Sequence, residues 1–267
     1  MASTRSITRD TGAFTRATAG SQSLARGLRL LRAFRPGVGT LTNADLALRS
    51  GLPRSTISRL TRVMVDEGFL SYDIAARGYR LSAVYLGLSN VYRYEIPMVD
   101  AALPLMKSIA EGEKINVGLA IGEHSEMMYL ESVRESRRGV FRRAGPGTRF
   151  PMELTASGRA YLAAISPTKR AKLLCEFAHI HVAAWPEIQR GITQAKEEIQ
   201  RHGYCAVQWQ PGLTALATCL VAPDGQVYSV SIGLHHVLGH DPSSLERYGS
   251  LLLLLQKNLG EAWRFLS

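Results

Sequence analysis

The chain contains the stretch Gly51-Leu52-Pro53-Arg54-Ser55-Thr56-Ile57-Ser58-Arg59-Leu60. It predicts a helix that has Pro53 in its first turn and runs to about Glu67, where Gly68 ends it. Pro53 suits the first turn of a helix, where its missing amide hydrogen has no partner to lose. The predicted buried face has apolar residues at helical spacing, namely Ile57, Leu60 and Met64. The opposite face carries only arginine and hydroxyl side chains before Asp66: Arg54, Ser55, Thr56, Ser58, Arg59 and Arg62.

This polar face is typical of a helix that enters the major groove of DNA. Arginine binds guanine bidentately, and serine or threonine binds a base or a phosphate. A shorter helix precedes it: Thr42-Asn43-Ala44-Asp45 matches a capping box, and Ser50-Gly51 ends that helix with a left-handed glycine. Two such helices joined by a tight turn indicate a helix-turn-helix. The alternative is an ordinary helical hairpin, but its solvated face would also carry glutamate and lysine.

The flanking segments complete a predicted winged domain over residues 21–82. An apolar stripe at helical spacing predicts its first helix: Leu24, Leu28, Leu31, Ala33 and Phe34. Residues 69–72 and 78–81 alternate as in strands and predict a two-stranded wing. Arg77 and Arg80 of this wing are predicted to contact the DNA backbone or the minor groove.

Positive charge is concentrated in the N-terminal part of the chain. The protein has 267 residues and a formal net charge of +10. Residues 1–82 contain 13 arginines, no lysine and five acidic residues, which leaves +8 there and +2 for the rest. Such a concentration of positive charge is typical of a phosphate-binding surface, although a basic surface can also be merely solvated. Residues 1–20 are predicted to be a flexible basic arm, lying along DNA or, as we favour, solvated.

The composition argues against several classes of protein. No apolar run approaches the roughly 18 residues of a membrane span, and the N-terminus lacks the apolar centre of a secretory signal. Three cysteines without a close pair, Cys175, Cys205 and Cys219, favour a reducing compartment, so we expect a cytoplasmic protein. Cys175 and Cys219 fall on predicted core faces and are interpreted as buried packing residues.

The C-terminal part, residues 96–267, is predicted to be an α+β domain with an antiparallel sheet, preceded by a linker helix over residues 83–95. The predicted strands cover 115–121, 127–133, 139–144, 204–209, 215–222 and 227–234, and an Asp-Gly turn joins the last two. The predicted helices cover 101–111, 155–165, 167–178, 186–202 and 242–265. Residues 145–151 are expected to form a loop.

Eight stretches of the chain resemble segments of one known protein family, and they occur in the same order along the chain. In the first part these are Ser23–Leu31, Gly51–Leu60, Glu67–Leu70 and Gly78–Leu81. In the second they are Arg143–Met152, Ala156–Leu162, Arg201–Tyr204 and Ser229–Gly233. Together they resemble the IclR-type transcriptional regulators over residues 21 to 265. The resemblance implies a winged helix-turn-helix, a linker helix and a GAF/PAS-like effector domain. It also implies homodimers, often paired into tetramers, that bind double-stranded operator DNA and respond to a small organic acid or aromatic metabolite.

The resemblance also implies an effector pocket. Its residues map here onto Ala156, Ser157, Val207, Gln208, Trp209, Ala215, Ser231 and Gly233. Family members that bind small dicarboxylate-like or keto acids carry an acidic residue and a cysteine near positions 207 or 208 and 215, and a second serine near 233. This chain has Val207, Ala215 and Gly233 there, beside Trp209, so we expect a less polar pocket and a larger or more aromatic ligand.

Two other functions stay open on the sequence. An enzyme carrying a helix-turn-helix would need a nucleophile and a base, but G-x-S-x-G, phosphate-loop and dinucleotide motifs are absent. A ligand-free architectural DNA-binding protein would need no cavity, whereas small residues gather around Gly145, Ser157 and Gly233. His235, His236 and His240 lack the other ligands of a known metal motif and are interpreted as a solvated loop. We therefore expect no catalysis and no cofactor.

Overall fold

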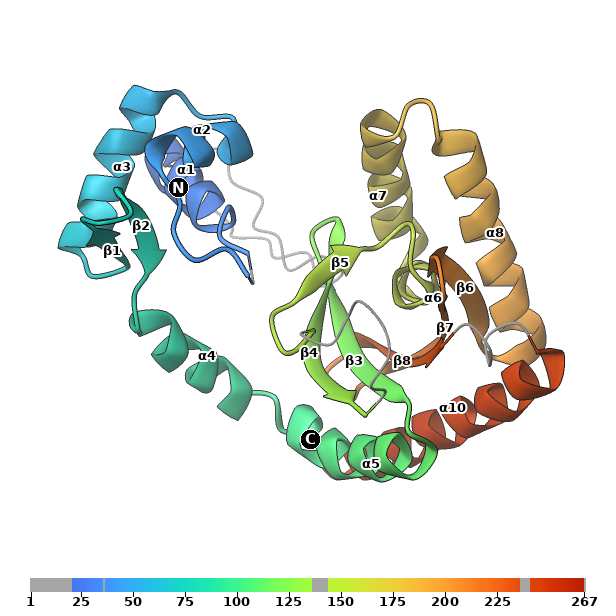
Figure 1. The fold of residues 1–267 in the computed structure, drawn as a ribbon. Coiled ribbons are helices and arrows are strands. Elements are labelled where there is room, and N and C mark those ends of the chain that lie inside the picture. The colour runs from blue at the N-terminus through green and yellow to red at the C-terminus, as the bar shows by residue number, and fades with distance from the viewer. Residues whose placement is uncertain (1–20, 36, 136–143, 236–240, 267) are drawn as a thin grey trace, which may run out of the picture. The chain divides into compact units, whose positions relative to one another are not determined.

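The chain divides into two compact units, which meet between Glu95 and Ile96 in the sequence (Figure 1). The computed structural model describes residues 21–35, 37–135, 144–235 and 241–266. None of the described helices is both long enough and apolar enough to cross a membrane.

The N-terminal unit is a winged helix-turn-helix. Its elements in chain order are α1 (Gln22–Leu31), α2 (Asn43–Ser50), α3 (Arg54–Asp66), β1 (Leu70–Asp73), β2 (Gly78–Leu81) and α4 (Val84–Tyr94). The two strands are antiparallel, with Tyr72 opposite Tyr79. Leu41, between α1 and α2, exchanges two backbone hydrogen bonds with Tyr79, and these bonds anchor the wing to the helices.

Buried aliphatic side chains hold the helices of this unit together: Leu30, Leu41, Leu46, Leu52, Ile57 and Leu70. The predicted capping box at the start of α2 is present. The Thr42 hydroxyl accepts from the Asp45 amide at 3.2 Å, and the Asp45 carboxylate accepts from the Thr42 amide at 2.9 Å. Gly51 ends α2 with a φ of 68°, the left-handed conformation expected of it.

The buried side of α1 differs from the predicted apolar stripe. Leu24 and Leu28 are 63% and 53% exposed, whereas Gly27 and Leu30 are buried. A Cβ on Gly27 would come within 3.1 Å of the Met64 methyl carbon on α3, so the two helices approach each other at the glycine. A pattern of apolar side chains cannot reveal such a contact because glycine has no side chain.

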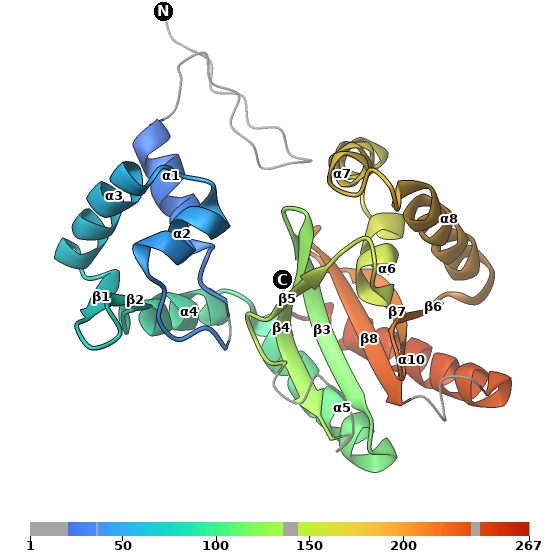
Figure 2. The ribbon, with the colours of Figure 1, turned by 45° about the horizontal axis from the view of Figure 1, so that its top comes forward.

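A six-stranded antiparallel sheet forms the centre of the C-terminal unit, in the order β5-β4-β3-β8-β7-β6. The strands are β3 (Asn116–Glu123), β4 (Glu126–Arg134), β5 (Arg149–Pro151), β6 (Cys205–Gln210), β7 (Leu213–Val221) and β8 (Val227–His235). The helices are α5 (Pro97–Glu113), α6 (Ala156–Ala164), α7 (Pro167–Ile180), α8 (Trp185–His202) and α10 (Pro242–Trp263). Helices α5 and α10 cover one face of the sheet, and α6 covers the other, with α7 and α8 beyond it (Figures 1 and 2).

The main core lies between the sheet and the α5–α10 pair. Successive strand residues point to opposite faces, and those directed toward this core are bulky: Val117, Leu119, Leu216, Val230 and Ile232. They pack with Leu252, Leu255 and Trp263 of α10, and the Trp263 indole donates to the Met98 carbonyl of α5 at 3.0 Å. This core fixes the positions of β3, β8 and β7. The opposite face of these strands is not needed to close it.

Three predictions for the C-terminal part need correction. Residues 149–151, expected in a loop, form β5, which pairs with β4 so that Met127 lies opposite Phe150. A strand of three residues that includes a proline shows no alternating pattern in the sequence, and it forms only because it pairs with β4.

Cys175 is exposed, because Leu173 and Phe177 occupy the buried side of α7 and Cys175 lies half a turn away. Cys219 is only partly buried. Most of the predicted strand 139–144 lies outside the described residues.

The position of α6 depends on a close contact at Gly158. A Cβ there would lie 1.9 Å from the carbonyl oxygen of Met152, so any larger residue pushes the helix off this segment. We predict that Gly158→Ala lowers the free energy of unfolding by about 3 kcal/mol in urea denaturation. Gly260→Ala in α10, with no atom within 4 Å of the added carbon, is the control and should be neutral or stabilising by up to about 1 kcal/mol. Equal effects of the two substitutions would contradict the account.

Candidate functional site

Helix α3 presents the polar face that the sequence predicts. Five of its six predicted contact residues are exposed, and Thr56 is half-buried; the exposed ones are Arg54, Ser55, Ser58, Arg59 and Arg62. On the opposite side Ile57 is fully buried, and the buried Thr61 hydroxyl donates to the Ile57 carbonyl at 3.0 Å. The buried side therefore leaves no polar group unpaired, and the exposed side is left for contacts outside the unit.

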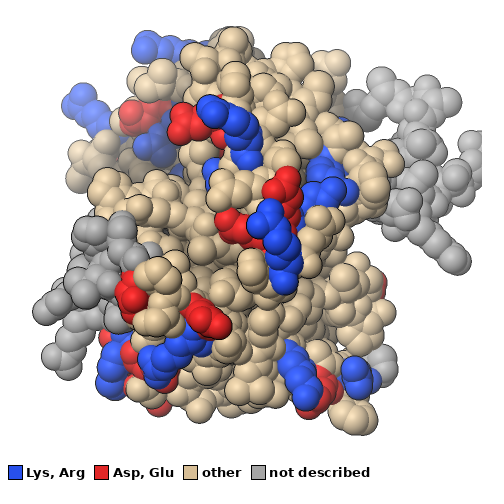
Figure 3. Space-filling model, turned by 90° about the vertical axis from the view of Figure 1, so that its right-hand side faces the viewer, with Lys and Arg blue, Asp and Glu red and all other residues tan. Residues whose placement is uncertain are grey.

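An ordinary surface helix of the same protein shows a different charge pattern. Helix α8 mixes both signs: Glu187, Arg190, Lys196, Glu197, Glu198 and Arg201. Figure 3 shows the side of the molecule on the right in Figure 1, along which α8 runs, and basic and acidic side chains are interspersed there. On α8 Arg201 pairs with Glu197 at 3.0 Å, whereas α3 has no acidic residue before Asp66 to neutralise its arginines.

The two wing arginines have different surroundings. Arg80 pairs with Asp73 at 2.8 Å across the wing. The hydrogen bond from the Ala76 amide to Asp73 and the charge of Arg80 lower the pKa of the Asp73 carboxyl, so it is ionised near neutrality and holds Arg80. Arg77 lies at the turn with a φ of 49° and has no partner within the described part of the chain. Arg77 is therefore the wing arginine available for a phosphate.

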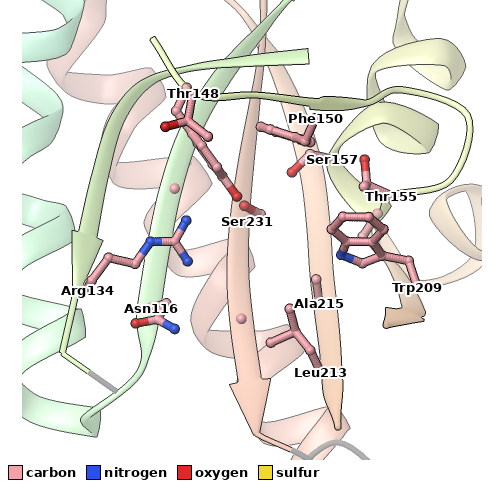
Figure 4. Close-up of a pocket in the computed structure, with 14 residues that line it drawn as sticks. Asn116, Arg134, Thr148, Phe150, Thr155, Ser157, Trp209, Leu213, Ala215 and Ser231 are labelled. Carbon is pink, nitrogen blue, oxygen red and sulfur yellow. The ribbon is translucent and has the colours of Figure 1, made fainter. Parts of the chain in front are cut away.

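A cavity of about 40 Å³ lies in the C-terminal unit, on the face of the sheet covered by α6 (Figure 4). Small side chains make room for it on neighbouring strands. Gly233 of β8 lies between Asn116 of β3 and Ala215 of β7 and pairs with both. Two residues further along β3, Gly118 pairs with Ser231 of β8. The segment from Thr148 to Ser157 covers these residues but cannot fill the space that they leave.

Three polar groups of the cavity lack hydrogen-bond partners within the described residues. Ser157 and Ser231 are only 4% and 7% exposed, and neither hydroxyl has a protein partner. The Nε of Arg134 is buried and also unpaired, while its guanidinium carbon lies 5.1 Å from the centre of the Tyr129 ring. A buried unpaired polar group such as the Arg134 Nε costs about 1–3 kcal/mol, so this arrangement suits a polar ligand that would pair with it and with the two hydroxyls.

The first turn of α6 borders the same cavity. The Thr155 hydroxyl caps the helix: it accepts from the Gly158 amide at 3.3 Å and donates to the Pro151 carbonyl at 2.7 Å. The amides of Ala156 and Ser157 belong to the first turn and have no intrahelical acceptor. The partial positive charge of this helix end favours an anion nearby.

Aromatic rings form the walls of the cavity. Tyr129 and Phe150 pack together with their ring centres 4.4 Å apart, and Trp209 stands at the opposite end from Arg134 (Figure 4). The Tyr129 ring lies over Gly118, where a Cβ would come within 2.5 Å of it. The cavity thus has a cationic end, two hydroxyls and flat apolar sides.

Comparisons with known protein families agree with both halves of this architecture. Residues 23–73 match the IclR helix-turn-helix domain, and residues 92–241 match the bacterial transcriptional regulator IclR C-terminal domain. The chain belongs to the IclR family of transcriptional regulators. It is therefore a regulator with a DNA-binding helix-turn-helix and an effector-binding C-terminal domain, not an enzyme.

Relatives within the IclR family cover most of the chain. The transcriptional regulator TsaQ1/TsaQ2 of Comamonas testosteroni is 30% identical over 70% of this chain and 67% of its own length. The Pca regulon regulatory protein of Pseudomonas putida is 25% identical over 89% and 82% of the two chains. The crystal structure of an IclR family regulator from Brucella abortus, 29% identical, superposes with a TM-score of 0.80 and covers 91% of this chain and 92% of its own.

Six of the eight residues predicted for the IclR effector pocket line the cavity: Ala156, Ser157, Trp209, Ala215, Ser231 and Gly233. Val207 and Gln208 do not; they border a second groove on the other side of Trp209. The prediction missed Asn116, Gly118, Tyr129, Arg134, Thr148, Phe150, Thr155 and Leu213. Arg134 and Asn116 make the cavity more polar than positions 207, 215 and 233 alone indicate. The small residues at 116 and 118, alternating with Val117 and Leu119, were the signal available in the sequence.

The three cysteines differ in their surroundings: Cys205 and Cys219 lie inside the C-terminal unit, whereas Cys175 is exposed on α7 with its Sγ 3.9 Å from His179 Nδ1. Burial raises the pKa of the Cys205 thiol to about 12 and raises that of Cys219 as well, so both stay protonated near neutrality. No three metal-ligating side chains come together among the described residues. His236 and His240 lie outside those residues, and the side chain of His235 is not described.

The cavity geometry makes a prediction about its two glycines. A methyl group at Gly118 meets the Tyr129 ring, whereas one at Gly233 finds its nearest neighbour, the Asn116 Cβ, at an ordinary 3.6 Å. We predict that Gly118→Ala lowers the free energy of unfolding by about 1–2 kcal/mol because the ring must move. Gly233→Ala should change it by less than about 0.5 kcal/mol. Urea denaturation compares the two variants, and a reversed order would show that the Tyr129 ring is not packed on Gly118.

Proposed function

We propose that this regulator acts in the cytoplasm, binds a specific operator through α3 and the wing, and is controlled by an aromatic carboxylic acid in the cavity beside α6. The observation that carries the ligand assignment is the unpaired, buried Nε of Arg134 in one cavity with the hydroxyls of Ser157 and Ser231, which have no protein partner among the described residues. These groups lie in a space that the protein itself does not fill.

The exposed side of α3 supports the DNA half of the proposal. A helix of 13 residues that offers three arginines and two serines, opposite the buried Ile57 and Thr61, has the form of a recognition helix. Arg54 and Arg59 lie in its N-terminal half, the part that reaches base edges when such helices dock. Arg77 of the wing supplies a further phosphate contact.

The ligand class follows from the chemistry of the cavity. A guanidinium matches a carboxylate, because its parallel N–H groups bind both oxygens. The rings of Tyr129, Phe150 and Trp209 suit a flat apolar body, and the Ser157 and Ser231 hydroxyls suit a further polar substituent. An IclR homologue from Microbacterium hydrocarbonoxydans, with the same fold at 22% identity, was crystallised with 4-hydroxybenzoate. We therefore propose a ligand of this kind.

An aromatic ligand requires part of the cavity to open. The volume of about 40 Å³ is well below the roughly 150 Å³ known to hold a benzene ring. Trp209 is only half-buried and stands at one end, so movement of its side chain enlarges the space most easily. Ligand binding would thus couple to the position of β6, which carries Trp209.

A homodimer is part of the proposal. Apolar residues of α1 and α4 are exposed in the single chain: Leu24, Leu28, Val84, Leu86, Leu88 and Val91. Two recognition helices about 34 Å apart would read half-sites separated by one turn of DNA. The effector would favour one arrangement of the two α4 helices and so reset this separation, to the extent that it binds one arrangement more tightly.

The recognition-helix assignment predicts the effect of two substitutions. Arg54→Ala or Arg59→Ala should weaken operator binding by about 1–3 kcal/mol if the arginine contacts a base. The operator is first selected from random duplexes, and fluorescence anisotropy then gives the affinity. Arg201→Ala on α8 is the control and should change nothing beyond a small salt-dependent effect.

Unchanged operator affinity in both α3 variants would refute the assignment. The mass of the complex on a palindromic duplex tests the dimer in the same series. Two chains per duplex agree with the proposal, and a single chain contradicts it. A larger assembly would mean that dimers pair on DNA.

The ligand assignment makes a separate prediction. Arg134→Gln should weaken binding of 4-hydroxybenzoate by about ten- to a hundredfold, the loss expected for a charge-assisted hydrogen-bonded pair. Calorimetric titration measures this affinity, with 4-hydroxybenzamide as the neutral matched ligand that should not bind. Operator binding without ligand should stay as in the wild type. If Arg134→Gln binds the acid as the wild type does, the carboxylate does not lie at Arg134.

A further inference from the structure

A second hollow lies on the far side of Trp209 from the effector cavity. This groove has a volume of about 740 Å³ and runs between α8, the end of α7 and the edge strand β6. Val207 and Gln208, predicted to line the effector pocket, border this groove instead, and Trp209 borders both spaces. Its volume falls in the range of small-molecule sites, which is roughly 300–1,000 Å³.

Arg159 of α6 lies at the inner side of the groove. Its Nε donates to the Glu153 carbonyl at 3.0 Å, and its guanidinium packs against Gly191 of α8, where a Cβ would come within 2.6 Å of Nη1. The two terminal nitrogens have no acceptor within the described part of the chain. A partly buried guanidinium is thus held in place by its inner end, with its paired outer donors unsatisfied.

The charges of Glu198 and Glu153 act on Arg159, but neither carboxylate forms an ion pair with it. The Glu153 carboxylate, 5% exposed, pairs with His181 at 2.8 Å. Glu198 accepts from the Ala206 amide at the edge of β6 at 3.2 Å. At the rim, Glu187 and Arg190 of α8 offset each other. Arg159 is therefore left without an ion pair among the described residues, and its terminal nitrogens can bind an external acceptor.

We propose that this groove is a second ligand site, which takes a planar aromatic carboxylate. The carboxylate binds the terminal nitrogens of Arg159, and the ring system lies against Trp209, with Gln194 and Gln208 at the open side. A rigid guanidinium with two free parallel donors beside an aromatic ring is the arrangement that such a molecule requires. Arg159, which would hold the carboxylate, lines this groove and not the effector cavity.

The probe is 2-naphthoate, a planar fused-ring carboxylate that is small enough for the groove of about 740 Å³. Calorimetric titration of the full chain should show one site per chain. Arg159→Gln should weaken binding about tenfold or more, and Arg159→Lys should weaken it as well, because lysine keeps the charge but loses the paired donors. Arg190→Glu changes an exposed rim residue, cannot disturb the core, and should weaken binding a few-fold through charge.

Two controls locate the site and check the fold. Arg134→Gln, in the effector cavity, should bind 2-naphthoate as the wild type does, and urea denaturation shows whether Arg159→Gln remains folded. Loss of binding in Arg134→Gln would place the probe in the effector cavity and overturn the proposal. So would unchanged binding in both the Arg159→Gln and Arg190→Glu variants, or no binding to the wild type at millimolar concentration.

Discussion

Strands β3, β8 and β7 carry bulky side chains toward α5 and α10 and small side chains toward α6. The bulky face, with Leu119, Val230 and Leu216, closes a core that needs no further partner. The opposite face has Gly118, Ser231 and Ala215. Because the first face alone fixes the strands, the second can leave space open at an acceptable cost in stability. The cavity is thus a consequence of how two sets of residues alternate along the same strands.

The covering segment keeps this space from collapsing. Gly158 sets α6 directly on the Met152 carbonyl, and Thr155 ties the first turn of α6 to Pro151. The helix end therefore stays beside the cavity instead of sinking onto the small residues. The buried and unpaired Arg134 Nε opposes folding by about 1–3 kcal/mol in the absence of ligand. Proteins commonly accept such a cost where a binding site requires it.

The sequence predicted the features that local patterns encode. The capping box at Thr42, the left-handed Gly51 and the two faces of α3 depend on neighbours within one or two turns, and the structure has all three. The features it missed depend on partners distant in the chain. Gly27 packs on Met64, β5 exists by pairing with β4, and Arg134 reaches the cavity only because the sheet brings β4 beside β3. The spacing of residues along one segment cannot predict these contacts, because each involves a second segment distant in the chain.

The measurement that tests the account most directly is the affinity of 4-hydroxybenzoate for the protein with and without saturating operator DNA. If the ligand controls operator binding from the cavity, thermodynamic linkage requires the DNA to change ligand affinity by the same factor by which ligand changes DNA affinity, typically about five- to 150-fold. The account predicts two equal factors in this range. Equal ligand affinities for the free and DNA-bound protein would contradict it, because the two sites would then be independent.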